Sequence, residues 1–281
     1  MKSLDNKVVV ITGAGSGIGR ALALKTASKG ARLALSDWDT DGLGETSSLV
    51  KAAGQEPRTD KLDVRDRAAM AAYATSVAEE FGVVNAIINN AGITVHGNFV
   101  DVTYEQFERV IDVDFWGVVN GTKEFLPHLI ESGDGHVVNI SSIFGLHGMP
   151  GQTSYNAAKF AVRGFTESLR MEMMIAKYPV QVTSVHPGGI KTNIVRNAEA
   201  AGEEDLEALN ELFDKVLANT SAEKAADIIV RGILKNKGKV LVGPDAFVID
   251  KLIRLAGPNY QRVLATTSDL AQKRAAKGRD K

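Results

Sequence analysis

The sequence predicts an α/β fold, a doubly wound parallel sheet of about seven strands with helices on both faces. Short runs rich in β-branched residues alternate with longer helical patterns along most of the chain. The first run, residues 7–12, is continuously apolar, as expected of a strand buried on both faces of a parallel sheet. A glycine-rich turn at residues 12–19 then leads into a helical pattern. Such alternation builds right-handed βαβ units, which place helices on both sides of the sheet.

The remaining elements follow in order along the chain. We expect further strands at 31–36, 58–62, 85–89, 136–140, 180–185 and 240–242, of which the run at 58–62 is the weakest. Between them we expect helices at 18–29, 42–53, 66–81, 104–130, 155–176 and 222–235. Two helices begin with the spacing of a capping box, in which two side chains bond reciprocally to the helix end: Thr103 with Gln106, and Thr220 with Glu223.

We predict a single domain over residues 1–243, followed by a C-terminal extension over 244–281. An insertion at about 193–219 interrupts the alternation and is acidic around 199–207. Its expected place over the carboxyl edge of the sheet favours a mobile lid, with a plain surface excursion as the alternative. The extension begins with a helix at 246–256 and ends in a basic tail. We interpret the tail as solvated or subunit-docking, with contact to an anionic membrane as the alternative.

The composition excludes several classes of protein. Hydrophobic residues make up 44% of the chain and the formal net charge is -1, so nothing indicates the basic surface that binds nucleic acid. No uninterrupted apolar stretch of about 18 residues predicts a membrane span. The acidic Asp5 and the lack of an apolar leader favour a cytoplasmic location. With no cysteine, the chain has no disulfide, thiol nucleophile or thiolate metal site, and we predict no metal centre.

The glycine-rich turn has the chemistry of a pyrophosphate-binding loop. Gly13, Gly17 and Gly19 let the backbone turn tightly and approach a phosphate, while Ser16 and Ile18 lie where the helix N-terminus offers free N–H groups. The spacing is Gly-x-x-x-Gly-x-Gly, because Ile18 occupies the last glycine position of a G-x-G-x-x-G motif counted from Gly13. A simple structural turn is the alternative, which the position between a strand and a helix disfavours.

Asp37 follows this turn by roughly the 20 residues expected of a ribose-binding carboxylate. Its charge would accept hydrogen bonds from both adenosine ribose hydroxyls and would repel a 2′-phosphate. The next residue is Trp38, so no adjacent cation offsets that repulsion. We therefore predict NAD rather than NADP as the cofactor. The alternative is that Asp37 belongs to a polar turn with Asp39 and Asp41.

Two short segments also stand at the ends of the third and fourth expected strands, where a doubly wound sheet forms its ligand crevice. These residues suit adenine-binding and backbone-spacing roles, although the second group could be a turn alone. They are Asp63 and Val64, then Asn89, Asn90, Ala91 and Gly92.

Tyr155 and Lys159 lie one turn apart on the same face of an expected helix. A free tyrosine has a pKa of about 10, too high for a base near neutrality, and a nearby ammonium lowers it. Upstream, Ser142 could hold a substrate oxygen by hydrogen bond and stabilise developing charge. These three residues are therefore candidate catalytic groups, against the alternative of an ordinary amphipathic pair.

Taken in this order, the motifs resemble the short-chain dehydrogenase/reductase family in its compact branch. The resemblance covers about two thirds of the chain and implies a Rossmann-like catalytic domain. It also implies hydride transfer between a nicotinamide and a carbonyl or alcohol carbon, with Tyr155 moving the proton and Lys159 binding the nicotinamide ribose. The residues that carry it are those of the glycine-rich turn, the strand-end residues above, Ser142, Tyr155, Lys159 and the segment Pro187, Gly188, Gly189, Ile190, Lys191 and Thr192.

The resemblance assigns further roles. It implies that Ile190 and Thr192 seat the nicotinamide carboxamide on a loop shaped by Pro187 and Gly188, where a plain proline-glycine turn is the alternative. It also implies that the two longest helices form subunit interfaces, so we expect a homodimer or homotetramer.

One residue departs from the family's pattern. Family members usually carry asparagine where this chain has Asp114, and that asparagine is thought to hold a water that links the lysine to solvent. An ionised aspartate accepts hydrogen bonds but cannot donate one, and it could pair with Lys159. We therefore add Asp114 to the candidate catalytic residues. It could be a tolerated substitute, it could retune the pH optimum, or it could impair the site.

The neighbourhood of the tyrosine favours a lipophilic secondary alcohol or ketone over a phosphorylated sugar, because the nearby residues are mostly apolar. They are Val95, Phe144, Leu146 and Met149, which could equally be ordinary packing; His96 and His147 could contact substrate or be structural. Motifs of metalloproteases, serine esterases and P-loop kinases are absent. Two other classes stay open: an NAD-binding sensor or structural relative with little turnover, and a lyase or epimerase that uses the cofactor transiently.

Overall fold

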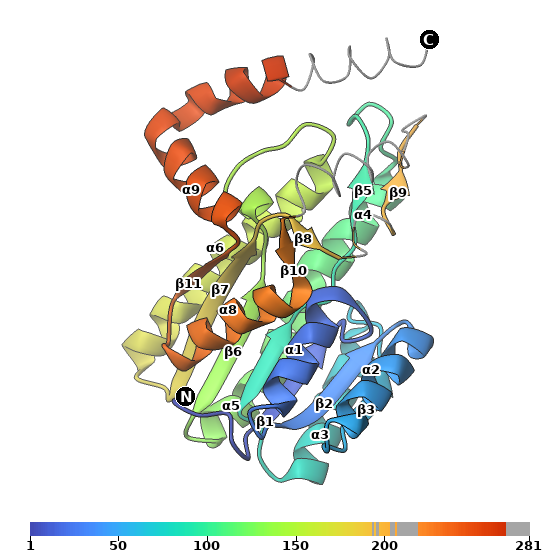
Figure 1. Cartoon of the computed structure of the whole chain (residues 1–281), viewed down its shortest axis with the longest axis vertical. Coiled ribbons are helices and arrows are strands. Elements are labelled where there is room, and N and C mark those ends of the chain that lie inside the picture. The colour runs from blue at the N-terminus through green and yellow to red at the C-terminus, as the bar shows by residue number, and fades with distance from the viewer. Residues whose placement is uncertain (193, 195–196, 203–205, 207–218, 268–281) are drawn as a thin grey trace.

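A seven-stranded parallel sheet forms the centre of the molecule (Figure 1). The computed structural model describes residues 1–192, 194, 197–202, 206 and 219–267. Its strands are β1 (Val8–Thr12), β2 (Arg32–Asp37), β3 (Arg58–Lys61), β4 (Ala86–Asn89), β6 (Gly135–Ile140), β7 (Val180–Pro187) and β11 (Lys239–Val242). They lie in the order β11-β7-β6-β4-β1-β2-β3, and every pair is parallel. This confirms the predicted doubly wound α/β sheet.

Helices cover both faces of the sheet. They are α1 (Gly17–Ala27), α2 (Thr40–Ala52), α3 (Arg67–Phe81), α4 (Tyr104–Ile111), α5 (Gly117–Glu131), α6 (Thr153–Ala176), α8 (Ala222–Leu234) and α9 (Pro244–Ala256). Residues of α1, α2 and α8 belong to the apolar cluster on one face, and residues of α3, α5 and α6 belong to the cluster on the other. Each predicted helix is present, with ends that differ by a few residues.

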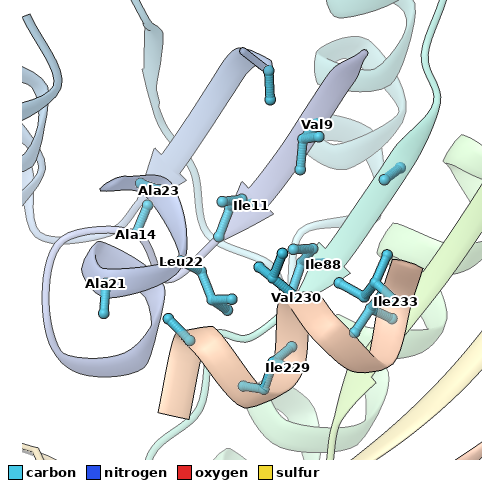
Figure 2. Packing of buried hydrophobic residues seen from close by; sticks show 14 of the residues in the cluster. Val9, Ile11, Ala14, Ala21, Leu22, Ala23, Ile88, Ile229, Val230 and Ile233 are labelled. Carbon is cyan, nitrogen blue, oxygen red and sulfur yellow. The ribbon is translucent and has the colours of Figure 1, made fainter. Parts of the chain in front are cut away.

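The first strand shows why its sequence is continuously apolar. Val9 and Ile11 pack into one cluster, whereas Val8 and Val10 pack into the other. In Figure 2, Ile11 lies near Leu22 of α1, and residues of α8 pack against the same face. Each such fully buried side chain contributes about 1.5–3 kcal/mol to stability. By contrast, β3 is an edge strand with only half-buried and exposed residues, which explains its weak sequence signal.

The strand order reverses between β1 and β4, because β1 pairs with β2 on one side and with β4 on the other. The connections that leave these two strands therefore run to opposite sides, and a crevice opens at their carboxyl ends. The glycine-rich turn after β1 and the Asn90 segment after β4 both lie at this point. The fold thus positions the predicted cofactor residues along one edge of the sheet.

The long helix expected at 104–130 is present but contains a π-helical turn, Asp112–Trp116, between α4 and α5. Thr103 and Gln106 form the predicted capping box at its start. The second predicted capping box, Thr220 with Glu223, is wrong. Thr220 belongs to a short strand, β10 (Thr220–Ser221), which pairs with β8 (Ile190–Lys191), and the next hydroxyl, that of Ser221, caps α8.

Part of the insertion is docked beside the active-site region. Its strand β9 (Glu199–Ala200) pairs with β5 (Val95–His96), and Gln106 Nε2 donates to the Glu199 carboxylate at 2.7 Å. Arg109 forms an ion pair with the same carboxylate. Most of the insertion, where we predicted a lid, and the tail at 268–281 lie outside the described residues. Among the helices that the structure describes, none is long and apolar enough to cross a membrane.

Candidate active site

Tyr155 and Lys159 lie at the start of α6 and are both buried, with 9% and 3% of their surface exposed. The Lys159 ammonium lies 5.4 Å from the centre of the Tyr155 ring. Ser142 follows β6 directly and caps the short 3-10 helix η2 (Ile143–Gly145), where its hydroxyl accepts from the Phe144 N–H at 3.1 Å. The Ser142 side chain also acts on Tyr155, because it lowers the pKa of the phenol. The structure therefore brings these three predicted residues together.

Asp114 lies in the π-helical turn with no exposed surface. Its Oδ2 is 3.0 Å from Lys159 Nζ, and its Oδ1 accepts from the Ile93 N–H at 2.7 Å. Lys159 Nζ also donates to the Ile140 carbonyl at 3.3 Å. A Cβ atom at Gly92 would lie 3.2 Å from Asp114 Oδ2 and 3.3 Å from Lys159 Nζ, so a side chain there would crowd the pair. Of the possibilities raised by the sequence, pairing of Asp114 with Lys159 is the one observed.

Burial and charge act against each other at this pair. Burial by itself lowers the pKa of Lys159, but the Asp114 carboxylate, and to a lesser extent Tyr155, raise it overall, so the ammonium stays charged. Burial raises the pKa of Asp114, and Lys159 and the Ile93 amide oppose that rise. Burial likewise raises the pKa of Tyr155; Lys159 and Ser142 pull it down, whereas Asp114 pushes it up. Burial therefore disfavours the charged form of all three groups, and the short contact between Asp114 and Lys159 opposes that effect within the pair.

His186 hydrogen-bonds to the backbone of Ser142, a contact that the sequence did not predict. Its Nδ1 lies 3.0 Å from the Ser142 carbonyl oxygen, and its Nε2 lies 2.9 Å from Ser184 Oγ. Because a carbonyl only accepts, Nδ1 must carry the proton, and Nε2 then accepts from the Ser184 hydroxyl. Burial lowers the pKa of His186 to about 4, which keeps this neutral form at physiological pH. No local motif marks His186, because its partner Ser142 lies far away in the sequence.

The glycine-rich turn packs tightly on the segment after β4. Gly13 has a φ of 66°, and a Cβ atom there would lie 2.7 Å from the Ala91 Cα, so only glycine fits. Asn90 Nδ2 donates to the carbonyls of Thr12 and Gly13, at 3.1 and 2.9 Å. The N–H groups of Asn90 and Ala91 both donate to the Thr12 hydroxyl. The two predicted cofactor segments are thus held as one unit.

The start of α1 is open to an anionic ligand. Its N-cap residue, Ser16, makes no side-chain capping hydrogen bond, so it does not satisfy the first free N–H groups of the helix. Asp37, at the end of β2, accepts from the Gly15 N–H at 2.7 Å, which fixes its carboxylate against the turn. The nearby guanidinium of Arg20 is occupied by the Gly15 and Gly42 carbonyls and by Glu45.

Asp63 and Val64 lie after β3 as predicted, but both are engaged within the protein. The Arg65 guanidinium forms an ion pair with Asp63 at 2.6 Å, and this hydrogen bonding holds the pKa of the Asp63 carboxyl below its usual range. The Val64 carbonyl accepts from Asn120 Nδ2 at 2.9 Å. Asn89, from the neighbouring strand end, bonds to Thr122 and Asn139 in the core.

The segment 187–192 reaches from β7 to the glycine-rich turn. The Gly188 N–H donates to the Val242 carbonyl at 2.8 Å, and the Gly189 N–H donates to Asp245 Oδ2 at 2.7 Å. At its far end, Thr192 Cβ would lie 3.2 Å from a Cβ atom placed on Gly17. Ile190 is buried on β8 between these points. The two glycine-containing loops therefore border the same crevice.

Apolar and aromatic groups line the tyrosine side of the site. The Phe144 ring meets the Tyr155 ring edge-on at 6.2 Å between centres, and the His147 ring meets Phe144 at 5.4 Å. Val95 and Leu146 are both buried, and Val95 packs with Tyr155 in one apolar cluster. His147 is 2% exposed, and its Nδ1 lies 3.0 Å from the Gly148 carbonyl.

These residues fit a dinucleotide. The turn at Gly13, which only glycine can form, lies beside the free N–H groups at the start of α1. Asp37, at the sequence spacing expected of a ribose-binding carboxylate, is held against this turn, and the segment 187–192 borders the same crevice. Within the described part of the chain, no group of three or more His, Asp and Glu side chains could hold a metal ion.

Comparison with known proteins agrees with this geometry. The family model described as short chain dehydrogenase matches residues 7–203. The protein named "Putative oxidoreductase SadH" from Mycobacterium tuberculosis (strain ATCC 25618 / H37Rv) is 57% identical over 265 residues, which cover 94% of this chain and 96% of that protein. Levodione reductase from Leifsonia aquatica is 37% identical over 196 residues, which cover 69% of this chain and 73% of that protein.

Solved structures show the same likeness. A short chain dehydrogenase/reductase from Burkholderia phymatum, in complex with NAD, superposes with a TM-score of 0.85 at 30% identity, covering 91% of this chain and 95% of that one. An alcohol dehydrogenase from Thermococcus sibiricus, complexed with 5-hydroxy-NADP, gives a TM-score of 0.72 at 25% identity, covering 85% and 96%. Structural relatives thus bind either nicotinamide dinucleotide. The chain is therefore an oxidoreductase that belongs to the short-chain dehydrogenase family.

Proposed function

We propose that this protein is an NAD-dependent oxidoreductase that interconverts a secondary alcohol and a ketone on a lipophilic small molecule. The observation that carries the proposal is the buried group of Ser142, Tyr155 and Lys159 at the carboxyl edge of the sheet. These side chains supply an acid, a cation that acts on it, and a hydroxyl for the substrate oxygen. That combination suits proton transfer coupled to hydride transfer.

Tyr155 is the proposed acid and base. In reduction its hydroxyl gives a proton to the substrate oxygen while the adjacent carbon gains a hydride; in oxidation the phenolate takes that proton back. Because burial raises the pKa of Tyr155, the phenol is protonated at neutral pH and suited to reduction. Oxidation needs the phenolate, which the Lys159 ammonium stabilises.

Ser142 holds the substrate oxygen in this proposal, and Asp114 sets the charge around the lysine. The Asp114 carboxylate keeps the Lys159 ammonium in place at 3.0 Å, but its negative charge partly cancels the effect of that ammonium on the phenol. This arrangement supports a retuned pH dependence over an inert substitution.

NAD would lie across the crevice, and when bound its nicotinamide would supply or take up the hydride. Lys159 and Tyr155 would bind the nicotinamide ribose, and Asp37 the adenosine ribose. The remaining proposed contacts are Gly13, Ser16, Gly17, Ile18 and Gly19 at the pyrophosphate, Asp63, Val64, Asn90, Ala91 and Gly92 along the adenosine and spacing side, and Pro187, Gly188, Ile190 and Thr192 at the carboxamide.

Asp37 supports NAD over NADP. Its carboxylate is fixed by the Gly15 amide, and the neighbouring cation, Arg20, is already bound to two carbonyls and a carboxylate. A 2′-phosphate would therefore meet a negative charge with no free cation from Arg20 to offset it.

The substrate proposal rests on the apolar surroundings of Tyr155. Phe144 and Val95 offer hydrocarbon surface beside the phenol, and one relative is named for the reduction of levodione. A lipophilic ketone or secondary alcohol suits such a wall better than a phosphorylated sugar.

We further propose that residues 1–243 act as one catalytic domain in a cytoplasmic homodimer or homotetramer. Exposed apolar side chains on α6, among them Met171, Met174 and Ile175, support assembly through this helix.

A substrate panel with NAD and NADP side by side tests the proposal. We expect a change in nicotinamide absorbance with lipophilic secondary alcohols or ketones, at higher efficiency with NAD. The buried charge of Asp114 favours one second candidate, a sensor that binds NAD with little turnover. Binding of NADH without absorbance change across the panel would favour that sensor. Product formed without net redox change would indicate an epimerase.

A further inference from the structure

The C-terminal extension touches both loops that border the proposed site. α9 starts where β11 ends, at the carboxyl edge of the sheet, and the chain continues through the 3-10 helix η4 (Gly257–Asn259) into helical residues 260–267 (Figure 1). Asp245 lies in the first turn of α9, and Tyr260 follows η4. These two side chains make the contacts.

Asp245 fixes the loop proposed to seat the nicotinamide. Its Oδ2 accepts from the Gly189 N–H at 2.7 Å. A Cβ atom on Gly188 would collide with the same carboxylate, which shows how closely the loop lies on α9. The Gly189 carbonyl is held from the other side by the Thr220 N–H at 3.2 Å. Both backbone polar groups of Gly189 are therefore fixed, one of them by the extension.

Tyr260 fixes the loop that follows Ser142. Its hydroxyl accepts from the Gly148 N–H at 3.0 Å. Its ring meets His147 edge-on at 6.1 Å, and His147 in turn meets Phe144, which meets Tyr155. A line of aromatic contacts thus runs from the extension to the candidate acid.

The contact between Tyr260 and this loop is narrow. A cavity of about 150 Å³ separates the two segments beside it, lined by Gly148, Pro150, Tyr260, Gln261 and Leu264. The neighbouring surfaces leave space between them here, and the Tyr260 hydrogen bond and ring contact join the two segments beside that space. Loss of that hydrogen bond should therefore be visible in the behaviour of the loop.

We infer that Asp245 and Tyr260 are positioning residues through which the C-terminal extension holds the two sides of the site: Asp245 sets the nicotinamide loop, and Tyr260 sets the substrate loop. The inference rests on the proposed function for the identity of the ligands, but the two contacts are separate. Each residue should therefore govern one ligand and leave the other unchanged.

Asp245→Ala and Tyr260→Phe test the inference, with Asp41→Ala and Tyr178→Phe as matched controls. Asp41 stands in the first turn of α2 as Asp245 does in α9, and Tyr178 is 47% exposed. Two measurements are made on the full-length protein: NADH affinity by fluorescence titration, and amide hydrogen exchange of peptides that contain Gly148 or Gly189. The KM for a bulky ketone is added once the panel supplies one.

We expect Asp245→Ala to weaken NADH binding about tenfold and to speed exchange at Gly189 only. Tyr260→Phe should speed exchange at Gly148 only and raise the ketone KM about fivefold, with NADH affinity unchanged. The inference would be overturned if both variants had the NADH affinity and amide exchange of the controls. It would also be overturned if each variant sped exchange at Gly148 and Gly189 equally. The exchange measurement needs no turnover, so failure of the proposed reaction would leave it readable.

Discussion

Replacing Asp114 with asparagine tests how charge in the buried pair governs the phenol. Asparagine has nearly the same shape, and its Oδ1 can still accept from the Ile93 amide, which lies 2.7 Å from Asp114 Oδ1. What changes is the negative charge 3.0 Å from Lys159 Nζ. Asp114 raises the pKa of Tyr155 and Lys159 lowers it, so loss of the carboxylate should lower the pKa of the phenol.

The size of the effect follows from Coulomb's law. Lys159 Nζ lies 5.4 Å from the Tyr155 ring centre and 3.0 Å from Asp114 Oδ2, so the carboxylate is at most roughly 8 Å from the ring centre. At an effective dielectric constant of about 20, a unit charge at that distance contributes about 2 kcal/mol. The phenolate fraction at a fixed acidic pH should then rise by about 30-fold.

The assay is the pH dependence of kcat for alcohol oxidation and for ketone reduction. Oxidation needs the phenolate, so the pH above which kcat for oxidation rises should be lower in the variant. Reduction needs the phenol, so the pH above which kcat for reduction declines should also be lower than in the wild type. Asp112→Asn, in the same π-helical turn but only partly buried, is the control. Superimposable curves, or a shift to higher pH, would refute the reasoning.

Three further predictions concern other residues. Asp37→Ala should reduce the preference for NAD over NADP by about tenfold, measured as a ratio of kcat/KM values, and an unchanged ratio would remove Asp37 from the ribose site. His186→Leu should lower kcat about tenfold without changing NADH affinity, and His186→Asn, which keeps a donor toward Ser142, should restore much of the rate; equal loss in both would rule out this positioning. Burial also lowers the pKa of His136 to about 3. As the pH falls below 6.5, this histidine is therefore protonated in the unfolded chain but stays neutral in the folded one. Stability in urea should therefore drop by about 2 kcal/mol per buried histidine between pH 7 and 5, and His136→Gln should lessen the drop; an equal drop in that variant would contradict the assignment.

Local sequence patterns predict the sheet well because β1, β4 and β6 are buried on both faces, which favours mostly apolar runs. Glycine spacing likewise predicts the turn after β1, since Gly13 has no room for a Cβ atom. These features depend on residues close together in the chain, and such patterns survive in a single sequence.

Features that depend on distant partners could not be predicted. The π-helical turn around Asp114 is flanked by helical backbone on both sides, at Ile111 and Gly117, so no turn or break in the sequence marks it. Two adjacent hydroxyls precede α8, and only the pairing of Thr220 with Ile190 leaves Ser221 as the cap. His186 and Asp245 bond to loops that lie far from them along the sequence and come close only in the folded chain.

The most direct test of the central claim is the turnover of Tyr155→Phe beside its affinity for NADH. Phenylalanine keeps the ring that packs against Phe144 but has no proton to transfer. We predict that kcat falls by about a thousandfold or more while NADH binds within about twofold of wild type. Substantial residual turnover, with NADH still bound, would contradict the claim that Tyr155 is the acid and base of this enzyme.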